Sequence, residues 1–197
     1  MLAHLDIIGS FIVAGLLLLT LMNVSVGVSE TTHWASMEQV AQGAAQTMGL
    51  ILEADLRRVG YLVPEGNGVF LAADTSNVKF AGDVDDDGQP DTVRYWVGAA
   101  SEASASVNPN DRVLHRSQNG VEDVPTEMGV TSLQFKYYDF KGLTTSNKSK
   151  IRSVRATIAV ESAEPYKDAY AQAGWQLRIR PRNINSAAEW SLELDEI

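Results

Sequence analysis

The feature that most constrains the fold of this chain is a run without any charged side chain, from Ile7 to Ser29. From Ile7 to Val28 the run is almost entirely apolar. About 22 helical residues span roughly 33 Å, and the hydrocarbon core of a bilayer is about 30 Å thick. We therefore predict a membrane-spanning helix over about residues 7–28.

Two other interpretations of this run are open from the sequence. A buried core helix is equally apolar, although a single small β domain rarely encloses so long a rod. A cleaved signal peptide normally begins with basic residues, whereas the first Lys or Arg of this chain is Arg57. Because neither flank of the run is basic, charge does not determine the orientation of the helix in a membrane.

An amphipathic pattern continues the helix beyond the uncharged run. Apolar residues recur at steps of three or four, as on one face of a helix. They are Trp34, Met37, Ala41, Ala44, Met48, Leu52, Leu56 and Val59. Gly60 suits the left-handed residue that ends a helix. The sequence predicts one helix from about residue 5 to about residue 60 with a single stripe facing a sheet, and local bending is expected at Gly27, Gly43 or Gly49.

Beyond Gly60 the apolar period changes to two, which is typical of β-strands. Short strands are predicted at 69–73, 78–81, 92–97 and 112–116, and longer ones at 130–139 and 151–161. In the longer pair, alternate apolar side chains are expected to face inward. They are Leu133, Phe135 and Tyr137, and Val154, Ala156, Ile158 and Val160.

A last strand around Leu177 and Ile179 is closed by Pro181, which has no N–H for a ladder. Short connections imply an antiparallel sheet, and the helix stripe would cover one face of it. Segments 99–111 and 143–150 are predicted to be mobile loops. The fold class is therefore α+β. We expect a helix over residues 1–60, a β-rich head over 61–185 and a tail over 186–197.

The segment from Asp83 to Asp91, of sequence DVDDDGQPD, is the strongest chemical signal. Aspartates at positions 1, 3, 5 and 9 and glycine at position 6 match the first part of an EF-hand calcium loop. We predict a calcium site at this loop. Its ligands would be Asp83, Asp85, Asp87, the carbonyl of Gln89, and Asp91.

The match to a calcium loop is incomplete, because Arg94 stands at position 12 in place of the usual glutamate. A carboxylate that is distant in the sequence, such as Glu122 or Asp123, or a water molecule would then complete the coordination of the calcium ion. The alternative is a hairpin turn whose carboxylates cap backbone amides without a metal.

Composition excludes several classes of function. The net charge of −9 argues against a nucleic-acid partner, which needs a clustered basic surface. The chain has no cysteine, so disulfides and thiolate metal sites are excluded.

Enzymatic activity is not expected. The three histidines lack zinc-binding spacing, and Glu161 and Glu164 are interpreted as solvated charges at a strand end.

The order of these parts resembles that of type IV pilins, and more closely the minor pilins and pseudopilins with large β heads. Three segments carry the resemblance besides the apolar helix. Leu56–Tyr61 resembles the helix-end segment of that group, Val130–Asp139 its central strand and Arg180–Ile184 its closing segment. The resemblance implies a structural subunit of a type IV pilus-like or pseudopilus-like filament that polymerises through its apolar helix.

The resemblance also implies partners and a location. The partners would be copies of this chain or related pilin-like subunits, together with an inner-membrane assembly machinery. Before assembly the chain would cross the inner membrane once, with its head outside the cytoplasm. Afterwards it would lie in a periplasmic or extracellular filament. The rival hypothesis is a single-pass, membrane-anchored binding or adhesion module that does not polymerise.

The N-terminus departs from the family pattern. In the family a basic leader and a glycine precede an apolar run whose fifth residue is a glutamate, and this acid attracts the terminal amine of a neighbouring subunit. Here no basic leader precedes Gly9, and Ala14 stands five residues beyond it. Asp6 is the nearest acid. It would serve in assembly by pairing with such an amine, or it would cap the start of the helix at the water interface.

Overall fold

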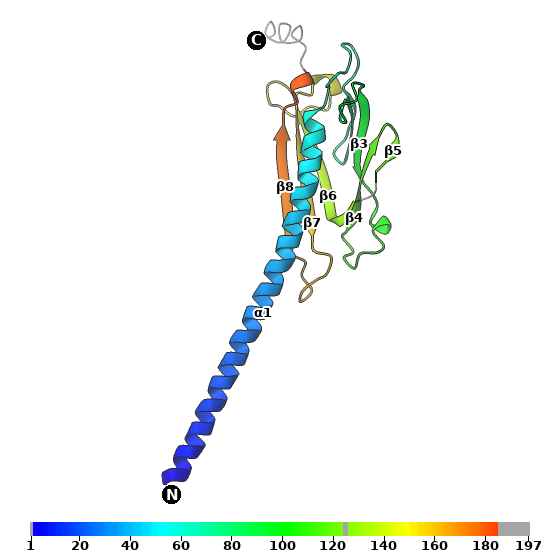
Figure 1. Ribbon diagram of the computed structural model, residues 1–197. Helices are drawn as coiled ribbons and strands as arrows, with labels where there is room; N and C mark the ends of the chain where they lie inside the picture. Colours follow the sequence, from blue (N-terminus) through cyan, green and yellow to red (C-terminus); the bar gives the residue numbers. More distant parts are fainter. Residues whose placement is uncertain (1, 124–125, 185–197) are drawn as a thin grey trace.

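The computed structural model describes residues 2–123 and 126–184 of the 197-residue chain, with side chains from Ile7 onward except at 126–128. A single long helix carries a β-rich head on its outer part (Figure 1). This arrangement confirms the α+β class and the long N-terminal helix. The predicted tail over 186–197 lies outside the described residues.

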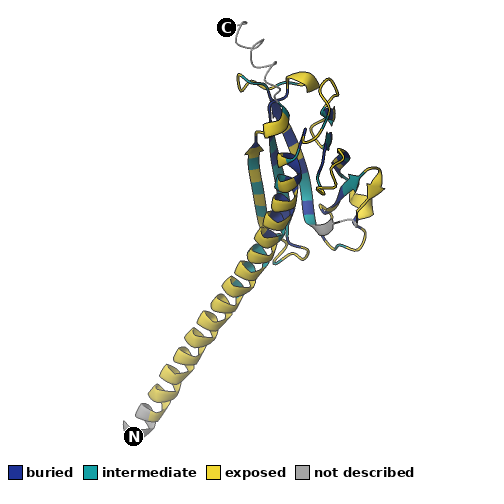
Figure 2. Cartoon of the chain, turned by 45° about the horizontal axis from the view of Figure 1, so that its top comes forward, coloured by how far each residue is buried: buried dark blue, intermediate teal, exposed yellow. Residues whose placement is uncertain are grey.

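Helix α1 runs without interruption from Leu2 to Arg57. It ends three residues before Gly60, which has a φ of 79° in the turn that follows. The first half of α1 makes no buried contact with the head, and all its side chains from Ile7 to Ser29 are exposed (Figure 2). This half is long and apolar enough to cross a membrane.

The head is built on one antiparallel sheet of eight strands. The strands are β1 (Phe70–Ala73), β2 (Asn77–Gly82), β3 (Asp91–Val97), β4 (Arg112–Gln118), β5 (Val121–Glu122), β6 (Thr126–Tyr138), β7 (Ser153–Glu161) and β8 (Gln172–Ile179). Their order across the sheet is β1-β2-β3-β4-β6-β7-β8, with β5 added beside β4. Short 3₁₀ turns lie at η1 (Ala100–Glu102), η2 (Lys148–Lys150) and η3 (Arg182–Ile184).

The core lies between the outer part of α1 and the sheet. Leu52 and Leu56 on the helix, and Val59 in the turn that follows it, are at most 1% exposed. They face the inner side chains of the long strands, and every residue predicted to point inward on β6 and β7 is buried. Each such aliphatic side chain contributes about 1.5–3 kcal/mol on burial. The predicted sheet-facing stripe of the helix is confirmed, with Trp34, Met37 and Ala44 only half-buried at its margin.

Three parts of the sheet were not predicted. One is the start of β6, residues 126–129, which precedes the strand predicted at 130–139. The two-residue strand β5 is too short to give a periodic signal. The first half of β8 contains Ala173 and Gly174, whose side chains are too small to show the alternation of a strand. Its hydrogen-bonded pairing with β7 defines this part of the strand.

Segment 99–111 is fastened to the sheet. The Asn108 side chain is 2% exposed and donates to Glu161 Oε2 and to the carbonyl oxygen of Ser162, at 3.0 and 3.1 Å. We predicted a mobile loop because the segment is rich in polar residues, which are usually solvated. In the structure the Asn108 amide instead forms hydrogen bonds to polar groups at the end of β7, and these hold the segment against the sheet.

Gly49 has a packing role. A Cβ placed on Gly49 would lie 2.3 Å from the ring of Trp175 on β8, whereas one placed on Gly43 would meet nothing within 4 Å. The indole therefore packs directly on the helix backbone. We expected Gly49 only as a position where the helix is weakened, because its partner lies more than a hundred residues away in the sequence.

We predict that Gly49→Ala lowers the free energy of unfolding by about 1–3 kcal/mol, because the indole must leave its position against α1. The matched change Gly43→Ala should stabilise the helix by up to about 1 kcal/mol. Chemical denaturation of the detergent-solubilised chain, followed by tryptophan fluorescence, measures both. Equal effects of the two substitutions would contradict the proposed packing.

Candidate functional site

The acidic loop between β2 and β3 begins and ends with buried aspartates. Asp83 and Asp91 are 1% and 3% exposed, while Asp85, Asp86 and Asp87 at the tip are exposed. Oxygen atoms of Asp83, Asp85 and Asp91 lie within 4.8 Å of one another. The structure therefore brings together three of the four aspartates predicted as metal ligands.

Asp87, the fourth carboxylate predicted as a ligand, lies outside this oxygen cluster. The Asp87 carboxylate accepts a hydrogen bond from the backbone N–H of Gln89 at 2.7 Å, and both residues are exposed. Glu122 contacts His115 and Asp123 pairs with Arg116, so each distant acid that we considered as a further ligand is engaged elsewhere.

Backbone and amide donors hold the three clustered carboxylates. Asp83 accepts from the N–H groups of Asp86 and Gly88, at 2.7 and 3.1 Å. Asp91 accepts from Val84 N at 3.1 Å and from Asn119 Nδ2 at 2.6 Å. These are the capping contacts of an Asx-type turn. Each carboxylate oxygen has a second lone pair, so the same arrangement suits a hard cation such as calcium.

The environment of Asp91 favours its ionised form. Burial opposes the charge, but the Val84 N–H, Asn119 and Gln118 together hold the pKa of the Asp91 carboxyl below its ordinary value. Ionised Asp91 therefore stabilises the fold above about pH 4, and this contribution is lost as the pH falls through the lowered pKa.

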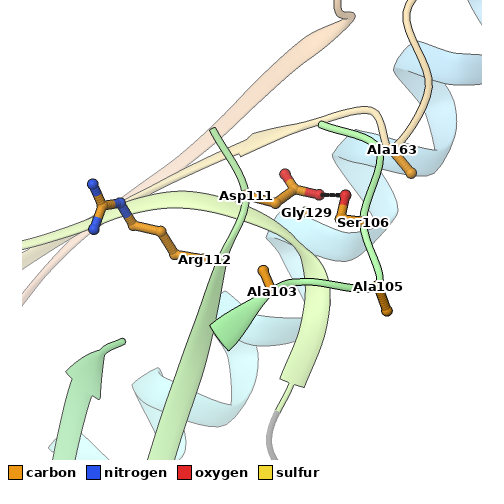
Figure 3. A pocket seen from close by; sticks show the side chains of 7 residues that line it. All are labelled: Ala103, Ala105, Ser106, Asp111, Arg112, Gly129 and Ala163. Atoms are coloured by element: carbon orange, nitrogen blue, oxygen red, sulfur yellow. Dashed lines mark hydrogen bonds between the residues drawn. The ribbon is translucent and has the colours of Figure 1, made fainter. Parts of the chain in front are cut away.

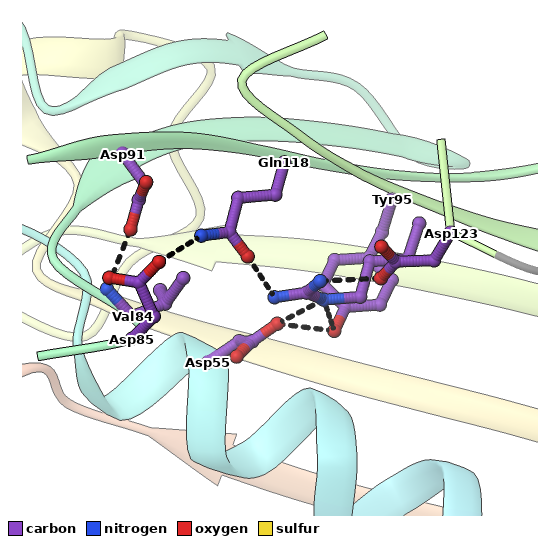
Figure 4. Close-up of polar contacts among 8 residues, drawn as sticks. Asp55, Val84, Asp85, Asp91, Tyr95, Gln118 and Asp123 are labelled. Carbon is purple, nitrogen blue, oxygen red and sulfur yellow. Dashed lines mark hydrogen bonds and ion pairs between the residues drawn. The ribbon is translucent and has the colours of Figure 1, made fainter. Parts of the chain in front are cut away.

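A buried polar network connects the loop to the last turns of α1 (Figure 4). Asp55 Oδ2 accepts from Tyr95 Oη at 2.6 Å and from Arg116 Nε at 2.7 Å. Gln118 links Arg116 to the acidic loop, because it accepts a hydrogen bond from Arg116 Nη2 at 3.4 Å and donates one to Asp85 Oδ2 at 2.9 Å. One carboxylate of the metal candidate is thus connected through two side chains to the helix.

Burial and neighbouring charges shift the pKa values of two groups in this network, Tyr95 and Arg116. Burial raises the pKa of the Tyr95 hydroxyl, and the neighbouring Asp55 carboxylate adds to the effect. Burial works against the charge of Arg116, but its hydrogen bonds to Asp55 and Asp123 raise the pKa of the guanidinium. Both groups therefore keep their protons, and the network holds a fixed charge pattern around neutral pH.

The turn after α1 also lies directly on the start of the acidic loop. Gly60 N donates to Ala81 O at 2.9 Å, and Asp83 N donates to Tyr61 O at 3.0 Å. Arg58 pairs with Asp86 at 2.6 Å. The loop is therefore part of the joint between helix and sheet. Local sequence patterns do not predict this joint, because its contacts join residues that are distant along the chain.

A second polar cluster surrounds His115, which is 8% exposed on β4. Its Nε2 lies 2.8 Å from Glu102 Oε2, its Nδ1 contacts Glu122, and its ring stacks on Trp96. The Ala99 N–H and His115 lower the pKa of Glu102. The cluster attaches η1 and β5 to the sheet, which gives this histidine a structural role that the sequence did not indicate.

A small cavity of about 190 Å³ lies beside segment 103–112 (Figure 3). Asp111 in its wall is 4% exposed and contacts Ser106. Burial raises the pKa of the Asp111 carboxyl. The rest of the lining is Arg112, Gly129 and three alanines, and the Asp111 carboxylate is already engaged with Ser106.

The side chain of Asp6, predicted to act in assembly, lies outside the described side chains. The chain matches no protein-family model, and comparison with curated proteins and with solved structures finds no match.

We predict that Asp55→Asn lowers the free energy of unfolding by about 3–5 kcal/mol, because it removes one partner of a buried ion pair. Glu53→Gln, two residues away, removes an i,i+4 pair with exposed Arg57 and should cost no more than about 0.5 kcal/mol. Urea unfolding of both variants measures the difference. A small effect of Asp55→Asn would show that the network does not stabilise the joint.

Proposed function

We propose that this chain is a structural subunit of a type IV pilus-like or pseudopilus-like filament. In this proposal α1 anchors the chain in the inner membrane before assembly, with the head outside the cytoplasm, and afterwards packs with the helices of neighbouring subunits. The observation that carries the proposal is the amount of apolar helix surface that the head leaves uncovered. Phe11 in the first half of α1 is 75% exposed, and Val40 beside the head is 70% exposed.

The boundary between the uncovered apolar half and the head is sharp. Along α1 from its N-terminus, Glu30 is the first residue with a described side-chain contact to the head. Its Oε1 lies 2.7 Å from Lys167 Nζ. His33 follows, with its ring 5.1 Å from that of Tyr166. Glu30 is the first charged residue after the uncharged run. This agreement supports a head that begins where the bilayer ends, with tyrosine and lysine at the interface.

A second apolar stripe on α1 supports polymerisation. It lies outside the sheet-facing stripe, is exposed along its length, and consists of Val40, Gly43, Thr47, Leu50, Ile51 and Ala54. Its spacing of three and four residues forms one face of the helix, and it continues the apolar surface of the first half. The predicted sheet-facing stripe is therefore accompanied by a second apolar stripe that the head leaves uncovered. Membrane anchoring alone gives no reason for this second stripe, whereas a helix bundle would bury it.

The exposed stripe gives a direct test. We predict that the full-length chain forms filaments or large oligomers, and that Leu50→Glu reduces them at least tenfold because a charge must then be buried in the bundle. Gln46→Glu, on the exposed polar face, should have little effect. Negative-stain microscopy and sedimentation measure assembly, and the melting temperature checks that the heads stay folded.

The rival hypothesis, an anchored binding or adhesion module, predicts a different result. Detergent-bound monomers for the unaltered chain and for both variants would contradict the filament proposal and favour that module.

We further propose that calcium binds the acidic loop and stiffens the joint between helix and head. The proposal rests on the convergence of oxygens from Asp83, Asp85 and Asp91, and on the charge of a loop with five carboxylates in nine residues. Calcium prefers such oxygen ligands, and exposed extracellular sites bind it with dissociation constants of about 10⁻⁴–10⁻³ M.

We predict that millimolar calcium raises the melting temperature of the chain, because a ligand that binds only the folded state stabilises it. Asp85→Asn should abolish most of this shift. Asp87→Asn should preserve it, since Asp87 lies outside the oxygen cluster. Thermal melts with calcium and with a chelator provide the measurement. If the unaltered chain melts at the same temperature in both, the loop is a metal-free turn.

A further inference from the structure

Strand β8 forms one edge of the sheet, and among the described residues it pairs only with β7 (Figure 1). The strand is eight residues long and contains no proline and a single charged side chain, Arg178. The opposite edge, β1, has four residues, and Lys148 Nζ donates to the carbonyl oxygen of its Leu71 at 2.9 Å. Short edge strands and lysine side chains block an edge in this way, because unpaired N–H and C=O groups recruit a further strand. The edge of β8 carries no such block and can accept one more strand.

The inner face of β8 is also incompletely covered. Three of its inward residues pack against the core but are only half-buried, whereas their partners on β7 are at most 1% exposed. The pairs are Ala173 with Val160, Trp175 with Ile158 and Leu177 with Ala156. A strand beside β8 that carried apolar side chains on the same face would cover these half-buried residues.

The segment that follows the described residues has the sequence pattern of such a strand. From Ala188 to Asp195 the sequence AEWSLELD alternates between apolar and polar residues at every position. The apolar residues are Ala188, Trp190, Leu192 and Leu194, and the polar ones are Glu189, Ser191, Glu193 and Asp195. Strict alternation over eight residues is typical of a strand with one buried face. On a helix, by contrast, Leu192 would lie on the face opposite Trp190.

The charge of this segment complements the outer face of the sheet. Lys136, Arg155 and Arg178 lie side by side there, in register across β6, β7 and β8. Arg178 donates to the neutral Ser153 hydroxyl, and Arg155 Nε is buried without an acceptor among the described residues. Opposite charges on neighbouring strands stabilise a sheet. A strand whose outer residues are Glu189, Glu193 and Asp195 would place its acids beside this basic row.

The segment is tethered close to the edge of β8. The chain leaves β8 at Ile179 and passes through η3, where Ile184 packs against the core. Residues 185–187 span up to about 10 Å, and neighbouring strands lie about 4.8 Å apart. Residues 188–195 can therefore turn back and run antiparallel along β8.

We propose that residues 188–195 add a strand to the edge of β8 in the same chain, in antiparallel pairing. Trp190 and Leu192 then cover Trp175 and Leu177 on the inner face, and the acids lie on the outer face. A shift of the pairing by one residue would turn the acids inward, so the pattern selects the register. The added strand closes the edge and prevents heads from pairing edge to edge. This inference is independent of filament assembly.

Disulfide formation tests the pairing, and the natural chain has no cysteine to interfere. Gln176→Cys, on the exposed outer face of β8, is combined in turn with a cysteine at each position from 189 to 193. Residues that face the same way on neighbouring strands have Cβ atoms about 5 Å apart, which a disulfide bridges after a small adjustment. We expect a cysteine at 189, 191 or 193 to oxidise at least about fivefold faster than one at 190 or 192. Leu177→Cys, which faces inward, should reverse this preference.

The measurement is mild oxidation of the full-length chain in detergent, followed by non-reducing electrophoresis and peptide mass spectrometry, with melting temperatures to check that the heads stay folded. Equal rates at all five positions, or no disulfide in folded heads, would overturn the inference. Chains that carry only Gln176→Cys are also mixed with chains that carry only Ser191→Cys. Disulfide-linked dimers in this mixture, at the yield of the doubly substituted chain, would show that a second copy supplies the strand and would also overturn it. Both cysteines of the main test belong to one chain, so its result does not depend on whether filaments form.

Discussion

The architecture depends on the burial of one stripe of α1 beneath the sheet. Leu52 and Leu56 on α1, with Val59 in the turn after it, are at most 1% exposed, and together they contribute several kcal/mol to holding the head on the helix. The head covers only the outer half of α1, so the first half of the helix is left uncovered. An apolar helix that leaves its own domain must be covered by lipid or by other helices, and the filament proposal is built on that requirement.

At the end of α1, polar contacts add to this apolar attachment of the head. Asp55, Arg116 and Gln118 connect the helix to the acidic loop through hydrogen bonds in a largely buried region. A cation at the loop would therefore act on the junction between spine and head as well as on a surface turn.

Local patterns in the sequence were sufficient to predict the helix, the main strands and the turn at the acidic loop. Each depends on spacing within a few residues, such as the alternation in β6 and β7. The unpredicted features pair distant residues. Gly49 meets Trp175 across the fold, and Asp55 meets Arg116. Asp87 fits the spacing of a calcium ligand, but its side chain turns to cap a backbone amide.

The filament proposal requires α1 to be one continuous rod that runs from the bilayer into the core of the head. Pulsed electron paramagnetic resonance between spin labels at Ser25→Cys and Ala54→Cys, with single copies in lipid nanodiscs, tests it most directly. A continuous helix predicts a narrow distance distribution near 44 Å, because 29 residues rise about 1.5 Å each. A broad distribution centred at clearly shorter distances would mean that the helix breaks at the membrane surface, and would contradict the account.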